Sequence, residues 1–174
     1  MYSGKNKLIL FLFFVTPFCL ASPEEQRQFE DLICSTKWEY LEEQNEILKA
    51  KVIQKRENGI KTVLRGSLAF TNWTGVITEI DVLSTDKVAL TVSIGCKIKL
   101  KTWNNTFSDL SDGTLIDLDS KVGDSLSKLF IGNKVKVAGS FVPGLNTYIK
   151  EISLTNYGQM REPEYLVHFR EIFN

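Results

Sequence analysis

Apolar side chains recur every three or four residues in the first long segment after residue 22. The stripe consists of Phe29, Leu32, Ile33, Thr36, Tyr40, Gln44, Ile47, Leu48 and Val52, of which two members are polar. This spacing predicts the buried face of an amphipathic helix. Ser22-Pro23 before an acidic first turn predicts its start, and Asn58-Gly59 predicts its end. A helix of roughly 35 residues is about 50 Å long, so we expect it to protrude from the domain, to kink, or to pair with a helix of another chain.

From Trp73 onward the alternation of polar and apolar residues has a period of two, which predicts β-strands. We expect strands over residues 73–82, 87–94, 97–101, 131–141 and 147–154, and an extra strand over 163–169. A short helix over 119–130, capped by Ser120, separates the third strand from the fourth. This order is that of the OB-fold, a five-stranded Greek-key barrel. The predicted fold class is mainly β with α: an OB-fold-like barrel over residues 69–174, preceded by a long helix within residues 22–68.

The first 21 residues have the order of a secretory signal peptide. Two lysines precede an unbroken apolar run from Leu8 to Val15, and CLA at 19–21 places small residues before a cleavage site. A short buried helix, or a lipid attached to Cys19, would be the alternatives. The run is too short to span a membrane, which takes about 20 residues. We therefore expect export, cleavage before Ser22, a periplasmic or secreted product, and no membrane span after cleavage.

Two short motifs resemble those of OB-fold domains. GNKVKVAG, residues 132–139, is similar to the glycine-bounded entry into their fourth strand, and WTGVI, residues 73–77, is similar to their first strand. With its signal peptide and leading helix, the chain resembles the small exported OB-fold proteins of bacteria, a group with uncharacterised and nucleic-acid-binding-like members. The resemblance covers residues 70–155, and it implies the fold. OB-folds bind oligonucleotides, oligosaccharides and proteins, so the resemblance names no ligand.

Removal of the first 21 residues changes the charge and the cysteine count. Two of the 21 basic residues leave while all 21 acidic residues stay, so the net charge goes from zero to about −2. A net charge this close to zero gives no strong electrostatic attraction for a polyanionic partner. Cys34 and Cys96 remain. In an oxidising compartment they are candidates for a disulfide, with two buried thiols as the alternative.

The sequence contains no recognisable catalytic or metal-binding pattern. Its single histidine, His168, has the place of a solvent-side residue on a terminal strand, and neither G-x-S-x-G nor a phosphate-binding glycine motif occurs. Asp109, Asp112 and Asp117 do not follow the ligand spacing of an EF-hand. We therefore expect no enzyme, no metal and no cofactor.

Five lysines could form a basic outer face on neighbouring strands of the barrel: Lys97, Lys99, Lys101, Lys134 and Lys136. Such a face binds single-stranded nucleic acid when it also offers aromatic rings for base stacking. The residues that share this face are alanine, threonine and serine, and lysines on an outer face commonly keep strands soluble. Binding of single-stranded nucleic acid is therefore the alternative function.

The stretch TWNNTFSDLSDGTLI, residues 102–116, follows Lys99 and Lys101 and gathers aromatic, amide and carboxylate side chains. Trp103, Asn104 and Asn105 could offer a ligand a stacking plane and amide hydrogen bonds; alternatively, Trp103 caps the core and the asparagines form a turn. The leading interpretation is an exported, non-enzymatic binding module of the cell envelope that contacts a protein or a glycan. Self-association through the N-terminal helix stays open.

Overall fold

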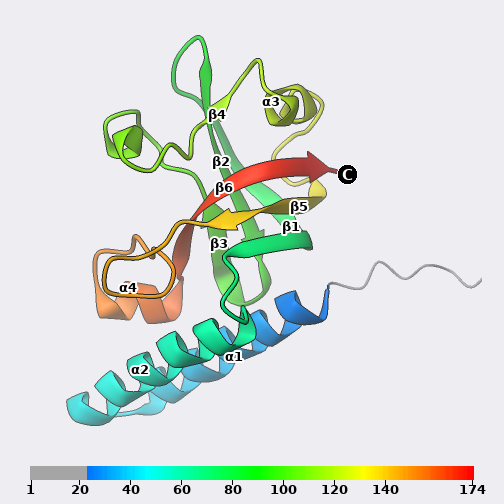
Figure 1. Ribbon diagram of the computed structural model, residues 1–174. Helices are drawn as coiled ribbons and strands as arrows, with labels where there is room; N and C mark the ends of the chain where they lie inside the picture. The colour runs from blue at the N-terminus through cyan, green and yellow to red at the C-terminus, as the bar shows by residue number, and fades with distance from the viewer. Residues whose placement is uncertain (1–22) are drawn as a thin grey trace, which may run out of the picture.

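The computed structural model describes residues 23–174. It begins with two helices that run antiparallel and pack side by side, α1 (Glu24–Glu42) and α2 (Glu46–Val63) (Figure 1). The prediction of one continuous helix is therefore wrong in its middle, because the chain reverses at residues 43–45. The predicted signal peptide and the predicted cap Ser22 lie outside the described residues.

The reversal has a local cause in two polar side chains. The Glu43 carboxylate accepts hydrogen bonds from the backbone N–H groups of Gln44 and Asn45, both at 2.8 Å. The Asn45 side chain then accepts from the N–H groups of Ile47 and Leu48, and so caps α2. Ile47 and Leu48 are exposed at the tip of this helical hairpin, and they do not belong to the buried stripe that the spacing predicted.

Gly59, the predicted end of the helix, is instead a contact inside α2. A Cβ at this position would lie 2.7 Å from the Leu32 side chain of α1, so glycine permits the close approach of the two helices. The helical region ends later, where Arg65 and Gly66 both have positive φ, at 49° and 79°. The predicted stop residue is thus a packing residue.

Five strands form a closed barrel beside the hairpin: β1 (Ala69–Val82), β2 (Lys87–Ile94), β3 (Ile98–Lys101), β5 (Lys134–Phe141) and β6 (Glu164–Phe173). The connections contain η1 (Gly95–Lys97), η2 (Ser108–Leu110), β4 (Ile116–Asp117), α3 (Lys121–Leu126) and α4 (Asn156–Arg161). β1 pairs with β5 through its first half and with β2 through its second half, and two bulges bend it. The closed order β1-β2-β3-β6-β5 is that of an OB-fold-like barrel, as the sequence predicted.

The fifth strand of the barrel is β6, and the predicted strand over 147–154 is wrong. β6 pairs in parallel with β3 and antiparallel with β5, which closes the barrel. Segment 147–154 makes only isolated bridges, at Ile149 and Glu151. Burial explains the choice, because 147–154 buries Ile149 alone whereas β6 buries Tyr165, Leu166, Val167, Phe169 and Ile172. The predicted extra strand is therefore an integral member of the barrel.

The core fills the barrel, and the hairpin closes one end of it (Figure 1). Aromatic rings dominate this end. The ring of Phe29, on α1, lies 5.2 Å from Trp73 and 5.6 Å from Tyr165, and Phe141 lies 5.7 Å from Trp73. Trp73 is fully buried. Because α1 contributes core side chains, the hairpin and the barrel share one hydrophobic core.

Two covalent or polar links add to this packing at the turn between β2 and β3. A disulfide joins Cys34 of α1 to Cys96, with 5.7 Å between their Cα atoms, which is an ordinary separation for such a bond. The Glu30 carboxylate accepts the N–H of Gly95 at 3.0 Å. Among the described helices, none combines the length and the apolar composition needed to cross a membrane.

Candidate functional site

One carboxylate organises the loop of residues 102–115, between β3 and β4. Asp109 is buried, and it accepts hydrogen bonds from the N–H and the hydroxyl of Thr114, at 2.5 and 2.7 Å, and from the N–H of Leu115 at 3.1 Å. The Thr114 hydroxyl also accepts the N–H of Trp103 at 2.9 Å, which ties the two ends of the loop together. Three bonds to one ionised group are strong ones, so they hold the loop in a defined conformation.

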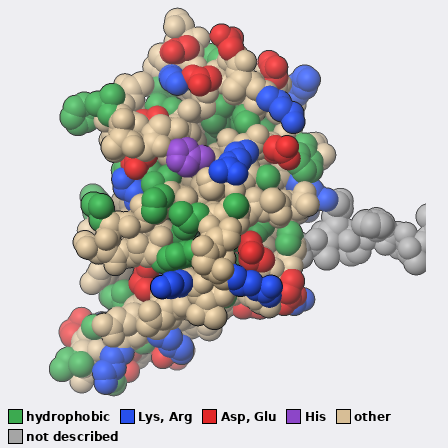
Figure 2. Space-filling model, viewed as in Figure 1, with side chains coloured by type: hydrophobic (Ala, Val, Ile, Leu, Met, Phe, Trp, Pro, Cys, Tyr) green, Lys and Arg blue, Asp and Glu red, His purple; other side chains and the backbone are tan. Residues whose placement is uncertain are grey.

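This loop presents an apolar pair that the sequence analysis did not single out. The N–H of Leu110 donates to the carbonyl of Phe107 at 3.4 Å, and the two side chains are 80% and 83% exposed. Residues three apart eclipse in a 3₁₀ turn, so both point the same way. Hydrophobic side chains project at the left edge of Figure 2, where Figure 1 draws this loop. The signal in the sequence was two large apolar residues, Phe107 and Leu110, among the polar residues in the middle of the loop.

Trp103 connects this loop to the segment that precedes α4. Its indole N–H donates to the Asp112 carboxylate at 2.8 Å, and the Lys150 ammonium donates to the same carboxylate at 2.6 Å. Lys150 also lies 5.5 Å from the centre of the Trp103 ring. Burial raises the pKa of Asp112, but the bonds from Lys150 and Trp103 outweigh it and lower the pKa below its ordinary value. The polar edge of Trp103 and one face of its ring are thus engaged within the protein.

Asn104 and Asn105 are exposed, follow Trp103 in the chain, and belong to the turn that leads into η2. The Asn105 amide donates to the Asn104 side-chain oxygen at 3.0 Å, and its own oxygen accepts the N–H of Ser108 at 2.8 Å. Bonds of this kind between an asparagine and nearby backbone are typical of turns. Both asparagines therefore have partners inside the loop.

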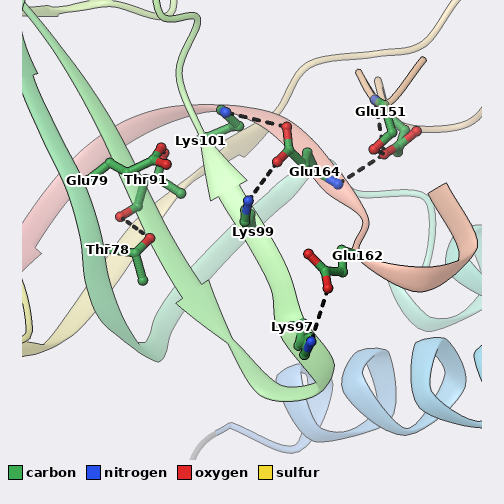
Figure 3. A network of polar contacts seen from close by, with 10 residues as sticks. Thr78, Glu79, Thr91, Lys97, Lys99, Lys101, Glu151, Glu162 and Glu164 are labelled. Carbon is green, nitrogen blue, oxygen red and sulfur yellow. Dashed lines mark hydrogen bonds and ion pairs between the residues drawn. The ribbon is translucent and has the colours of Figure 1, made fainter. Parts of the chain in front are cut away.

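The lysines of β3, and Lys97 of η1 just before it, form ion pairs with carboxylates at the start of β6 and just before it (Figure 3). Lys99 and Lys101 share Glu164, at 2.8 and 3.4 Å, and Lys97 lies 3.0 Å from Glu162. Burial raises the pKa of Glu164, but Lys99 and Lys101 outweigh it and lower the pKa. The parallel pairing of β3 with β6 places these carboxylates beside the lysines, so this face offers little uncompensated positive charge.

The five lysines expected on one basic face lie in two separate groups. β6 separates β3 from β5, and Lys99 pairs across from Glu164 whereas Lys136 pairs across from Phe173 at the other end of β6. By the other way around the barrel, Lys134 lies across from Val76, Val76 across from Ser93, and Ser93 across from Lys99, so three strand spacings, about 14 Å, separate the two groups. Lys134 and Lys136, unlike the β3 group, form no ion pair within residues 23–174. The expectation of neighbouring strands is therefore wrong for this set.

The three aspartates considered as cation ligands each bond to donors of the protein. Asp109 and Asp112 are engaged as described, and Asp117 pairs with Lys87 across β2 and β4. Within residues 23–174, no group of three histidine, cysteine or carboxylate side chains is placed to hold a metal ion. The arrangement of these aspartates is that of structural turn residues.

A buried polar cluster lies where α2 meets the segment before β6. Arg56 is buried and donates to the backbone carbonyl of Gln159 at 2.6 Å. Burial raises the pKa values of Glu57 and Glu151, and the charge of Arg56 lowers them by less. Burial also raises the pKa of Tyr165, which lies in the same cluster. A single arginine on an amphipathic helix carries no pattern, so the sequence did not point to this cluster.

No protein-family model, curated protein or solved structure matches the chain. The fold is therefore described by its topology alone. Because OB-fold-like barrels serve many functions, the function has to be argued from the surfaces of this molecule.

Proposed function

We propose that the chain is an exported, non-enzymatic binding module, and that Phe107 and Leu110 contact a protein partner. The observation that carries the proposal is the exposure of both side chains on a loop organised by Asp109; their spacing of three residues in a 3₁₀ turn predicts that they point the same way. A loop that is already ordered loses little entropy on binding. Burial of the two side chains in a partner's pocket would contribute about 25 cal/mol per Å² of apolar surface.

A protein partner is favoured over a glycan by the contacts around Trp103. A small-ligand site combines an apolar surface with polar groups that converge on the ligand. Here the polar groups nearest the aromatic ring are already bonded: Trp103 to Asp112, and Asn105 to Ser108. Phe107 and Leu110 offer an apolar contact without such groups, which fits a hydrophobic pocket on a protein.

Single-stranded nucleic acid is disfavoured by the ion pairs on β3. Binding through Lys99 and Lys101 would require their release from Glu164, and it would weaken steeply with salt because counterions are released. We expect no binding of a short DNA strand through this face at physiological salt. Salt-sensitive binding that is lost in Lys99→Glu/Lys101→Glu would contradict the proposal.

Site-specific photo-crosslinking tests the proposed contact, because it joins the loop covalently to whichever molecule lies against it. A photoreactive phenylalanine analogue replaces Phe107 in the producing cell, and a control chain carries it at Leu154, which is fully exposed. We expect a discrete protein adduct at position 107 alone, which disappears when Leu110→Asp is added. Equal adducts at both positions, or none at 107, would refute the proposal, and a glycan array would then test the glycan alternative.

The resemblance to small exported OB-fold proteins of bacteria, and a location in the periplasm or outside the cell, belong to the same proposal. The apolar run from Leu8 to Val15 and the small residues before Ser22 support it. The intact mass of the exported product should correspond to a chain that starts at Ser22. A product that retains residues 1–21 would contradict the expected processing.

A further inference from the structure

A second surface, separated from the β3 lysines by β2, is formed by the outer faces of β1, β5 and β6. Cross-strand pairing places Val76 beside Lys134, and Lys136 between Thr74 and Phe173. A groove of about 530 Å³ follows these side chains. The surface therefore combines apolar side chains of β1 and β6 with two lysines of β5, the strand between them.

An apolar turn lies immediately before β5, close in sequence to Lys134, which lines the groove. Phe130 and Ile131 are 70% and 63% exposed. The turn is anchored to β1, because the N–H of Gly132 donates to the carbonyl of Ile77 at 2.8 Å and the N–H of Ile77 donates to the carbonyl of Asn133 at 3.0 Å. Its backbone is thus held on the outside of the barrel, where the two apolar side chains cannot reach the core.

The lysines of this surface differ from those of β3 in their partners. Lys97, Lys99 and Lys101 each pair with a carboxylate, of which Lys99 and Lys101 share one, whereas Lys134 and Lys136 form no ion pair within the described part of the chain. Their positive charge is available to an external anion. Lysines beside exposed aromatic and aliphatic side chains are typical of proteins that bind the surface of an anionic membrane.

The start of α1 lies next to the same surface. The Gln26 side chain donates to the carbonyl of Thr74 at 2.7 Å and accepts its N–H at 2.8 Å. The helix α1 therefore begins beside the groove, next to Thr74 of its lining.

We propose that this surface binds anionic phospholipid, with Phe130 and Ile131 inserted between headgroups and Lys134 and Lys136 against their phosphates. The proposal is independent of the protein contact at Phe107. Single-stranded nucleic acid is a poorer fit, because it needs a series of exposed rings among the lysines. Here Phe130 and Phe173 are the exposed rings of the surface, and its other apolar side chains, Ile131 and Val76, are aliphatic.

Co-sedimentation with vesicles tests the proposal on residues 22–174, which contain every element of the described fold. We expect binding to vesicles of phosphatidylcholine with phosphatidylglycerol, weakened by salt, and none to phosphatidylcholine alone. Phe130→Ser/Ile131→Ser should abolish it. Lys134→Gln/Lys136→Gln should weaken it about thirtyfold, taking about 1 kcal/mol for each lysine. Melting curves establish that each variant is folded.

The matched control is Phe107→Ser/Leu110→Ser, which removes an equally exposed pair elsewhere and should leave vesicle binding unchanged. Three results would overturn the proposal. They are the absence of binding to anionic vesicles, binding that survives loss of the apolar turn, and binding of a short DNA strand in preference to vesicles. A dimer seen by light scattering and lost in Phe130→Ser/Ile131→Ser would likewise assign the surface to a second copy of the chain.

Discussion

Replacing Asp109 with alanine tests whether one side chain organises the loop that presents Phe107. The variant removes three hydrogen bonds and leaves the N–H groups of Thr114 and Leu115 without their acceptor. Hydrogen bonds to a charged group contribute about 1.5–3 kcal/mol each, and three that share an acceptor are not additive. Since the freed groups can regain water when the loop opens, we expect a loss of about 3 kcal/mol in the free energy of unfolding.

Asp109→Asn is the matched control, because it keeps the shape of the side chain. The amide oxygen can still accept both bonds from Thr114, but the amide nitrogen cannot accept from Leu115. We expect a loss of about 1–2 kcal/mol. Urea unfolding at neutral pH measures both losses, and hydrogen exchange at the amide of Leu115 reports the loop itself.

Two measurements together would refute a role for the buried carboxylate. If Asp109→Ala unfolds within about 0.5 kcal/mol of the wild type and the amide of Leu115 exchanges no faster, the loop does not depend on Asp109. Phe107 would then not be presented on a loop that this carboxylate orders in advance. If stability falls but Phe107 still forms its crosslinked adduct, the contact is real and the ordering is unnecessary for it.

Reduction of the disulfide between Cys34 and Cys96 should lower the free energy of unfolding by about 4 kcal/mol, because the disulfide closes a loop of 62 residues. Alkylation of both thiols in the denatured, unreduced protein would disprove the bond. Gly139→Ala should cost about 2–3 kcal/mol in urea unfolding, because a Cβ there would overlap a carbonyl oxygen of β6; a negligible cost would show that β6 can shift. Stability should rise as the pH falls from neutral toward 4.5, because Glu57 and Glu151 have pKa values raised above 4.5 and bind protons more tightly in the folded state. Glu57→Gln/Glu151→Gln should abolish this rise, and a rise that persists in the double variant would contradict the assignment.

Local patterns in the sequence predicted the elements whose stability is local. Alternation over residues 87–94 and 97–101 predicted β2 and β3 and their hairpin, which the structure confirms. Ser120 was predicted as a helix cap, and its side chain accepts the N–H of Gly123 at 3.1 Å. The order of strands and helix also predicted the barrel correctly. The hairpin and the cap depend on residues that are near one another along the chain.

Two parts of the fold did not follow from the apolar pattern. The stripe from Phe29 to Val52 fits one helix as well as two, and the reversal at residues 43–45 depends on hydrogen bonds of the Glu43 and Asn45 side chains. Segments 147–154 and 163–169 both alternate, and the tertiary structure decides between them, because β6 pairs with β3 and β5 at once. A pattern of apolar positions identifies a buried face and leaves its partner undefined.

The same division applies to the surfaces. The sequence identified the loop of residues 102–116 as unusual, but it could not tell that Trp103 is engaged by Asp112 and Lys150 whereas Phe107 is exposed. It also counted Lys99 and Lys136 as one face, although only the former has a carboxylate beside it. Exposure and charge compensation depend on which distant segments become neighbours when the barrel closes. The sequence therefore determines which residue types a surface can contain, and the tertiary structure decides which of them remain free to bind.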